Sequence, residues 1–224
     1  MIKSKNESWG AFFLELAILA LIVLFIRFYI FQFFRVSGPS MCPTLNIIND
    51  ECRGESGSNP KGEFIFVNEL IYQLKDPKRG EIVVFKPPNK KVYYVKRILG
   101  IPGDTITIED DGLVYLENTE EGINKHQVSE NYLSPKNLGM THVRASEKIF
   151  IVGNGEFLVF GDNRLHSLDA RKCFNNIGCV DNRTPFLTKK NIVGRAEFVI
   201  WPFWTARWLE NNPFGYEPNS EKKK

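Results

Sequence analysis

The stretches EIVVF, at residues 81–85, and KVYYVKRIL, at residues 91–99, decide the fold class of this chain. Both are short runs rich in β-branched and aromatic residues. Similar runs occur at residues 63–67, 105–109 and 157–160, and Gly, Pro, Asn or Asp bounds them at close intervals. This pattern is typical of antiparallel strands in a sandwich or barrel. We therefore predict a mainly β domain with an antiparallel sheet of the sandwich or barrel kind.

An apolar segment precedes this domain at residues 11–34, interrupted only by Glu15, Arg27 and Gln32. As a helix it would span roughly 36 Å at ~1.5 Å per residue, enough for a hydrocarbon core of ~30 Å. A cleaved secretory signal is the alternative, because residues 36–38 resemble a small-x-small cleavage site. The apolar region of such a signal is about 7–15 residues long, however. A buried core helix fits poorly because Phe and Ile occupy every face. We predict a single transmembrane anchor.

The charges around this segment indicate an orientation. Lys3 and Lys5 precede it and Arg35 follows it, so the positive-inside rule leans toward an N-terminus inside. We therefore expect residues 1–10 to be a cytoplasmic tail and residues 35–224 to be an extracytoplasmic domain. The net charge of +3 is too small to predict a nucleic-acid partner.

Two further stretches stand out by composition. Residues 112–147 are irregular and polar, and we expect a hairpin excursion or small subdomain there. WPFWTARW brings Trp201, Trp204 and Trp208 close together in sequence. These rings either pack in the core or form an aromatic belt that rests on lipid.

The four cysteines suggest local disulfides. A short loop containing Asn and Gly separates Cys173 from Cys179, and Cys42 could pair with Cys52 in the same way. In an oxidising compartment an even number of cysteines is expected to pair. A zinc site would need closer cysteine pairs or histidines at ligand spacing. The histidines are scattered: His126, His142 and His166. We predict the Cys173–Cys179 disulfide, with Cys42–Cys52 as a second candidate, and no metal.

A candidate nucleophile and a candidate base lie in separate motifs. SGPSMCPTL places Ser40 directly after the apolar segment, and a serine needs a base to become nucleophilic. Lys96 lies on an apolar strand, where Tyr94 and Ile98 share its face. Burial there would lower the pKa of the lysine below its ordinary value of ~10.4 and make it a possible base. The alternative is a lysine that snorkels to solvent or pairs with a carboxylate.

A third motif, GDNRLHSLDAR at residues 161–171, begins with a turn directly after an apolar strand. It delivers Ser167, Asp169 and Arg171 at alternate positions, which project to one side in extended geometry. Together they could orient a neutral lysine amine and brace the sheet. An ordinary salt bridge between Asp169 and Arg171 is the alternative.

Together these motifs resemble those of bacterial signal peptidase I, a serine–lysine endopeptidase that removes signal peptides from exported preproteins. SGPSMCPTL is similar to its nucleophile box and YYVKRILGIPGD to its lysine box. GDNRLHSLDAR, with GRA at residues 194–196, is similar to its closing boxes. GEFIFVN and RGEIVVFKPP resemble the stretches between. The match extends from the apolar segment to about Ala196.

Carried over by position, the resemblance implies that Ser40 is the nucleophile and Lys96 the general base. It further implies that Ser167 hydrogen-bonds the lysine amine, with Asp169 and Arg171 in support. The oxyanion would be held by the backbone N–H of Ser40 with help from the Gly38 position. Some relatives carry a serine where Gly38 stands, so a backbone contribution is expected here. The candidates for a shallow pocket that accepts a small residue are Met41 and Tyr94.

The resemblance also implies the partners and location. We expect preproteins with an Ala-x-Ala-like site as substrates, a plasma membrane as the location, a position near the export translocon, and no cofactor. Two alternatives remain at this point. One is a same-clan peptidase for conjugation pilins or organellar precursors, and the other is a non-catalytic, membrane-tethered β-domain. Intact Ser40, Lys96 and Ser167 argue against the second.

Overall fold

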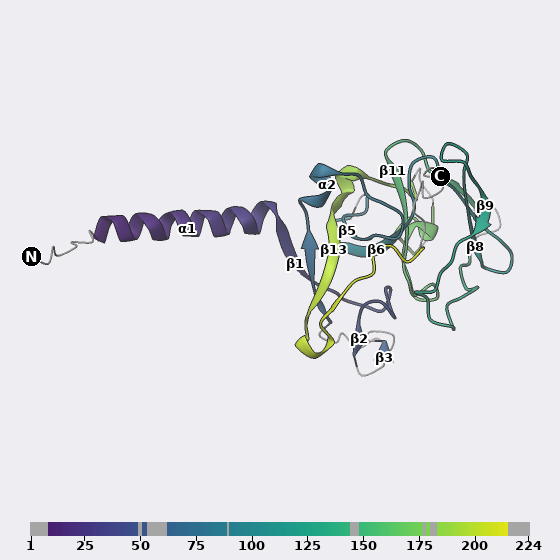
Figure 1. Cartoon of the computed structure of the whole chain (residues 1–224). Coiled ribbons are helices and arrows are strands. Elements are labelled where there is room, and N and C mark those ends of the chain that lie inside the picture. The colour runs from purple at the N-terminus through teal and green to yellow at the C-terminus, as the bar shows by residue number, and fades with distance from the viewer. Residues whose placement is uncertain are drawn as a thin grey trace, which may run out of the picture.

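The computed structural model describes residues 9–48, 51–52, 62–88, 90–143, 148–176, 178–179 and 183–214. The N-terminal helix α1 (Trp9–Tyr29) projects from a body of β-strands (Figure 1). The side chains described for α1, those of residues 9–24, are all exposed. Over the described part of the chain, no helix reaches the length and apolarity that crossing a membrane requires.

The apolar segment changes structure before its end. The helix was expected to run to residue 34, but it stops at Tyr29, and strand β1 (Phe31–Arg35) follows directly. β1 pairs antiparallel with β4 (Phe64–Asn68) over its whole length, from Phe31 opposite Asn68 to Arg35 opposite Phe64. The backbone groups of residues 31–35 thus find their hydrogen bonds in a sheet, which is why the helix does not continue.

A large antiparallel sheet of eight strands carries the site. Its order is β1-β4-β13-β5-β6-β11-β12, and β14 pairs with β13. The strands not yet bounded are β5 (Ile82–Phe85), β6 (Tyr94–Gly100), β11 (Glu156–Phe160), β12 (Leu187–Thr188), β13 (Ile192–Trp201) and β14 (Arg207–Trp208). The predictions behind β4, β5, β6 and β11 are confirmed within one to three residues at each end. β13 was not predicted, although it is the longest strand and lies in the middle of the sheet.

A second sheet packs beside the first. It consists of four antiparallel strands in the order β10-β7-β8-β9. Its strands β8 and β9 lie on the side of the body far from α1 (Figure 1). Their bounds are Thr105–Ile108 for β7, Val114–Asn118 for β8, Ile123–Gln127 for β9 and Ile149–Ile151 for β10. Within the hairpin excursion expected at residues 112–147, β8 and β9 pair as an antiparallel hairpin. The buried side chains of Val114 and Leu116 alternate with half-buried neighbours and form the inner face of β8.

The remaining described elements are short. They comprise β2 (Ile47–Ile48), β3 (Glu51–Cys52), α2 (Ile71–Leu74) and three 3-10 turns, η1 (Ala170–Lys172), η2 (Lys189–Asn191) and η3 (Phe203–Thr205). Both expected disulfides are present, Cys42–Cys52 and Cys173–Cys179. The first ties the loop after β1 to β3, and the second closes the loop that follows η1.

Two clusters of buried apolar side chains form the core. The larger one joins the two sheets and includes Ile98, Ile106 and Phe160. The smaller one includes Leu45 and Ile65 and lies beneath the loop that follows β1. That loop carries Ser40, so the candidate nucleophile rests on a packed base. The tryptophans are in neither cluster.

Trp201, Trp204 and Trp208 are instead exposed, at 48%, 63% and 78%. The core-packing alternative for these three rings was therefore wrong. Phe203 is exposed beside them, and its ring contacts those of Trp201 and Trp204.

Candidate active site

Ser40 and Lys96 lie in direct contact. Ser40 belongs to the loop after β1, and Lys96 is the third residue of β6. The amine Nζ of Lys96 donates hydrogen bonds to Ser40 Oγ at 2.6 Å and to the carbonyl of Val95 at 2.7 Å. A neutral amine in the same place accepts the serine proton across the same short distance, which is the geometry required of a general base.

The surroundings of Lys96 favour the neutral amine. The side chain is buried, and among the described residues no carboxylate forms an ion pair with it. The pKa of Lys96 is lowered to about 8, mainly by burial; the charges of Asp169 and Asp162 oppose this effect, and the charge of Arg171 adds to it. The alternatives of a snorkelling or paired lysine were therefore wrong. Burial was expected to dominate, but the role of Arg171 as a nearby cation was not foreseen.

Asp169 and Arg171 form a buried ion pair at 2.8 Å. Asp169 also accepts hydrogen bonds from the backbone N–H of Gly161 and of Arg171, and so caps the turn η1. Burial by itself would raise the pKa of Asp169, but the charge and hydrogen bonds of Arg171 lower it to about 2. The extended geometry expected for residues 167–171 was wrong, because this cap bends the chain into a 3-10 turn at Ala170.

Ser167 is buried but does not bond Lys96. Its hydroxyl helps to lower the pKa of the nearby Asp169 carboxyl, yet makes no regular hydrogen bond to any described residue. The expected hydrogen bond to the lysine amine is therefore absent from this structure. A Cβ atom on Gly161 would lie 2.1 Å from Ser167 Oγ and 2.4 Å from the carbonyl oxygen of Ser40. The bare backbone of Gly161 thus lets the hydroxyl of Ser167 and the nucleophile loop approach each other.

An open groove of about 290 Å³ runs past Ser40 and Lys96. One wall is the chain from Phe34 to Gly38, and the other comes from residues 93–96 of β6 and the segment before it. Tyr94 lines the groove, as expected for a pocket residue. Met41 does not. Its side chain is 1% exposed and packs in the smaller core cluster, so that expectation was wrong.

The loop that presents Ser40 is held by residues that the sequence analysis did not single out. Asn46 donates from its side-chain amide to the carbonyl of Gly38 at 2.8 Å. It also exchanges hydrogen bonds with Glu63, accepting from the backbone of Glu63 and donating its own N–H to the Glu63 carboxylate. Asn46 has a φ of 66°, a conformation that Asn adopts more readily than most residues. The only hint of this role in the sequence was an Asn directly after the SGPSMCPTL motif.

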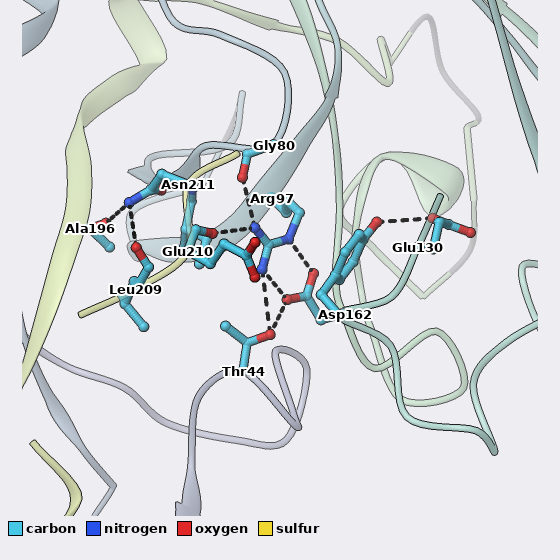
Figure 2. Close-up of polar contacts among 12 residues, drawn as sticks. Thr44, Gly80, Arg97, Glu130, Asp162, Ala196, Leu209, Glu210 and Asn211 are labelled. Carbon is cyan, nitrogen blue, oxygen red and sulfur yellow. Dashed lines mark hydrogen bonds and ion pairs between the residues drawn. The ribbon is translucent and has the colours of Figure 1, made fainter. Parts of the chain in front are cut away.

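A polar network occupies the side of β6 opposite Lys96. Arg97 binds Asp162 through two nitrogens, at 2.8 and 3.1 Å, and Thr44 donates to the same carboxylate (Figure 2). The guanidinium of Arg97 also lies 4.3 Å from the ring centre of Tyr132. This network joins the loop of Ser40, through Thr44, to the strand of Lys96.

A serine hydroxyl in contact with a buried lysine amine, beside an open groove in an antiparallel β fold, defines a serine–lysine hydrolase site. The family described as "Signal peptidase, peptidase S26" matches residues 9–201. The chain belongs to this signal peptidase family, as its motifs indicated.

Curated relatives agree with this assignment. The chain is 31% identical over 211 residues to signal peptidase I T of Bacillus subtilis strain 168, covering 90% of each chain. It is 34% identical over 207 residues to signal peptidase I of Bacillus licheniformis, covering 90% of this chain and 94% of the relative. It is also 34% identical over 211 residues to signal peptidase I S of Bacillus subtilis strain 168, covering 90% and 96%.

Proposed function

We propose that this protein is a membrane-associated serine endopeptidase that removes N-terminal signal peptides from exported preproteins. The observation that carries the proposal is the 2.6 Å contact between Lys96 Nζ and Ser40 Oγ in a buried setting. In this proposal Ser40 is the nucleophile and Lys96 the general base. Asp169, Arg171 and Ser167 fix the surroundings of the amine.

The reaction proceeds in two halves. Neutral Lys96 accepts the proton of Ser40 as Oγ attacks the carbonyl carbon of the scissile bond. The backbone N–H of Ser40 stabilises the resulting oxyanion, and the backbone at Gly38 contributes to this stabilisation. Protonated Lys96 then gives its proton to the leaving amine, and the signal peptide remains as an ester on Ser40. A water molecule, deprotonated by Lys96, attacks the ester and releases the signal peptide.

The groove supports an extended substrate with small side chains near the cut. Its two walls, residues 34–38 and 93–96, are short backbone segments that an added strand can pair with. Tyr94 and Leu168 narrow the groove beside Ser40. Small side chains at the residue before the cut, and two residues before that, fit such shallow walls, whereas Phe or Arg would clash.

The helix α1 supports a membrane location. Its described side chains are exposed and almost all apolar, and the exposed rings of Trp201, Trp204 and Trp208 add apolar surface to the β body. In this proposal α1 anchors the protein in a bacterial plasma membrane with the N-terminus inside. The domain with the two disulfides then faces the oxidising exterior, near the site where preproteins leave the translocon. Retention in the membrane pellet after alkaline extraction, and protease access only from outside, would test this placement.

Cleavage of a purified precursor tests the activity. The full chain in detergent is incubated with a precursor that carries an Ala-x-Ala site, alongside the Ser40→Ala variant. We expect a single cut after the second alanine by the wild type and none by the variant. Equal cleavage by Ser40→Ala, or a wild type that cuts after Phe or Arg, would overturn the proposal.

A further inference from the structure

Residues 207–211, which we call the C-terminal clamp, lie beyond residue 201, where the family match ends. The clamp contains strand β14 and crosses the large sheet at β13, where Phe198 pairs with Trp208 and the backbone N–H of Leu209 donates to Glu197. The Leu209 side chain is buried in the smaller core cluster. These contacts fix the clamp on the body of the protein.

One end of the clamp holds the loop of Ser40. Arg207 binds both carboxylate oxygens of Glu63, at 2.7 and 3.0 Å, and donates to the carbonyl of Thr44 at 2.7 Å. Glu63 is fully buried and accepts the backbone N–H of Asn46, whose side chain holds the carbonyl of Gly38. Arg207 therefore reaches the loop on both sides of Ser40, directly at Thr44 and through two residues at Gly38.

The other end holds the strand of Lys96. The backbone carbonyl of Glu210 accepts a hydrogen bond from Arg97 at 2.9 Å (Figure 2). Asn211 accepts the backbone N–H of Ile82 on β5 at 2.7 Å and donates to the carbonyl of Ala196 on β13 at 3.0 Å. Arg97 directly follows Lys96 in β6, so the clamp touches the backbone neighbour of the base.

We propose that the C-terminal clamp sets the position of Ser40 relative to Lys96, with Arg207 as the main positioning residue. Arg207 lies outside the groove lining and cannot contact the substrate there. Its loss changes the Ser40–Lys96 geometry, whereas the pairing of β1 with β4 and of β6 with β5 holds much of both groove walls in place. A displacement of about 1 Å at reacting atoms slows a reaction by about 10²-fold. This inference rests on the proposed peptidase activity.

The test compares kcat and KM for precursor cleavage in the full chain with Arg207→Ala, Arg207→Lys and Arg183→Ala. Arg183 is an exposed arginine away from the groove lining and serves as the matched control. We expect Arg207→Ala to lower kcat by about 10- to 100-fold with little change in KM. Because the Arg207 side chain is 35% exposed, millimolar guanidinium can enter its place and restore part of kcat. Arg183→Ala should keep wild-type kcat and show no response to guanidinium.

Arg207→Lys keeps the charge but not the planar fork that bridges Glu63 and Thr44, so we expect an intermediate kcat. If Arg207→Ala does not fold, this variant decides: a reduced kcat at the wild-type melting temperature supports the clamp. A wild-type kcat in either folded variant overturns it. A reduced kcat that guanidinium does not restore, together with a lower melting temperature, indicates a merely structural role and also overturns it. A wild type that does not cleave the precursor refutes the proposed function instead.

Discussion

Lys96 and Arg97 are consecutive buried residues of β6, but their contacts differ and their pKa values shift in opposite directions. Arg97 is paired with Asp162 and two backbone carbonyls; burial alone would lower its pKa, but the charge of Asp162 and its hydrogen bonds raise it. Lys96 contacts a hydroxyl and a carbonyl, and burial lowers its pKa to about 8. Consecutive side chains of a strand point to opposite faces of the sheet. The guanidinium of Arg97 therefore stays charged and stabilises one face, whereas the amine of Lys96 on the other face can lose its proton and act as a base.

The largest effect is expected on the Lys96 side. Lys96→Met removes the base while filling a similar volume, so precursor cleavage should fall by about 10³-fold or more. Burying the ammonium costs the wild type about 3 kcal/mol at neutral pH, so the variant should be at least as stable. Single-turnover cleavage assays and urea unfolding measure the two quantities.

The size of this stability difference depends on pH. The Lys96 pKa is lowered on folding, so the cost is fully present below about pH 8 and disappears as pH rises toward the ordinary value of 10.5. The advantage of Lys96→Met should therefore shrink over this range. Substantial cleavage by the variant, or an advantage that grows with pH, would contradict the assigned role of Lys96.

On the Arg97 side the effect falls on stability. Arg97→Met leaves the buried carboxylate of Asp162 without its cation, and the free energy of unfolding should drop by about 3–5 kcal/mol. Lys189→Met is the control, because Lys189 pairs with Asp76 at the surface, and it should change stability by less than about 1 kcal/mol. Equal losses in the two variants, read from urea unfolding curves, would contradict the structural role of the buried Arg97–Asp162 pair.

A substitution of Ser167 measures how much the residues near Lys96 contribute to the rate of cleavage. Ser167→Ala removes a buried hydroxyl that makes no regular hydrogen bond in the resting structure, so stability should stay the same or rise slightly. Loss of the hydroxyl that lies beside Gly161 and the loop of Ser40 should slow cleavage by at most about 10²-fold, less than the loss of the base. Steady-state kinetics and thermal unfolding check both. A loss as large as that of Lys96→Met would give Ser167 a direct part in proton transfer.

The smallest effect is expected from ionic strength on the pH dependence of cleavage. Cleavage by the wild type should rise with pH along a single limb near pH 8, where Lys96 becomes neutral, while Arg97 stays charged throughout. Because burial is the main cause of the lowered pKa, raising the ionic strength should move this limb only slightly. The measurement is the pH dependence of kcat at low and high salt. A limb near 10.5, or none between about 6 and 9, would exclude Lys96 as the titrating group.

Local sequence patterns predicted strands that are rich in β-branched and aromatic residues, and they failed where contacts distant in sequence decide the structure. β6 was recognised from its β-branched and aromatic residues, but β13 was missed, because Gly194 and Arg195 interrupt its apolar run. The helix boundary at Tyr29 could not be predicted either, since residues 31–34 continue the apolar run apart from Gln32 and form a strand by pairing with β4.

The same limit applies to the site. Ser40, Lys96 and the Asp169–Arg171 pair were found because their motifs are short and ordered. Met41 was misplaced, because sequence proximity to Ser40 does not tell which way a side chain points. Asn46, Glu63 and Arg207 were missed, because Glu63 joins an Asn 17 positions before it to an Arg 144 positions after it. No local pattern records such pairing.

Gly161 restricts how this sequence can vary through evolution. Any side chain there would collide with both the carbonyl of Ser40 and the hydroxyl of Ser167. A gene that acquires an alanine at this position must rebuild two parts of the site at once, which single substitutions rarely achieve. We therefore expect glycine at position 161 in any descendant of this protein that keeps the present geometry of Ser40 and Ser167.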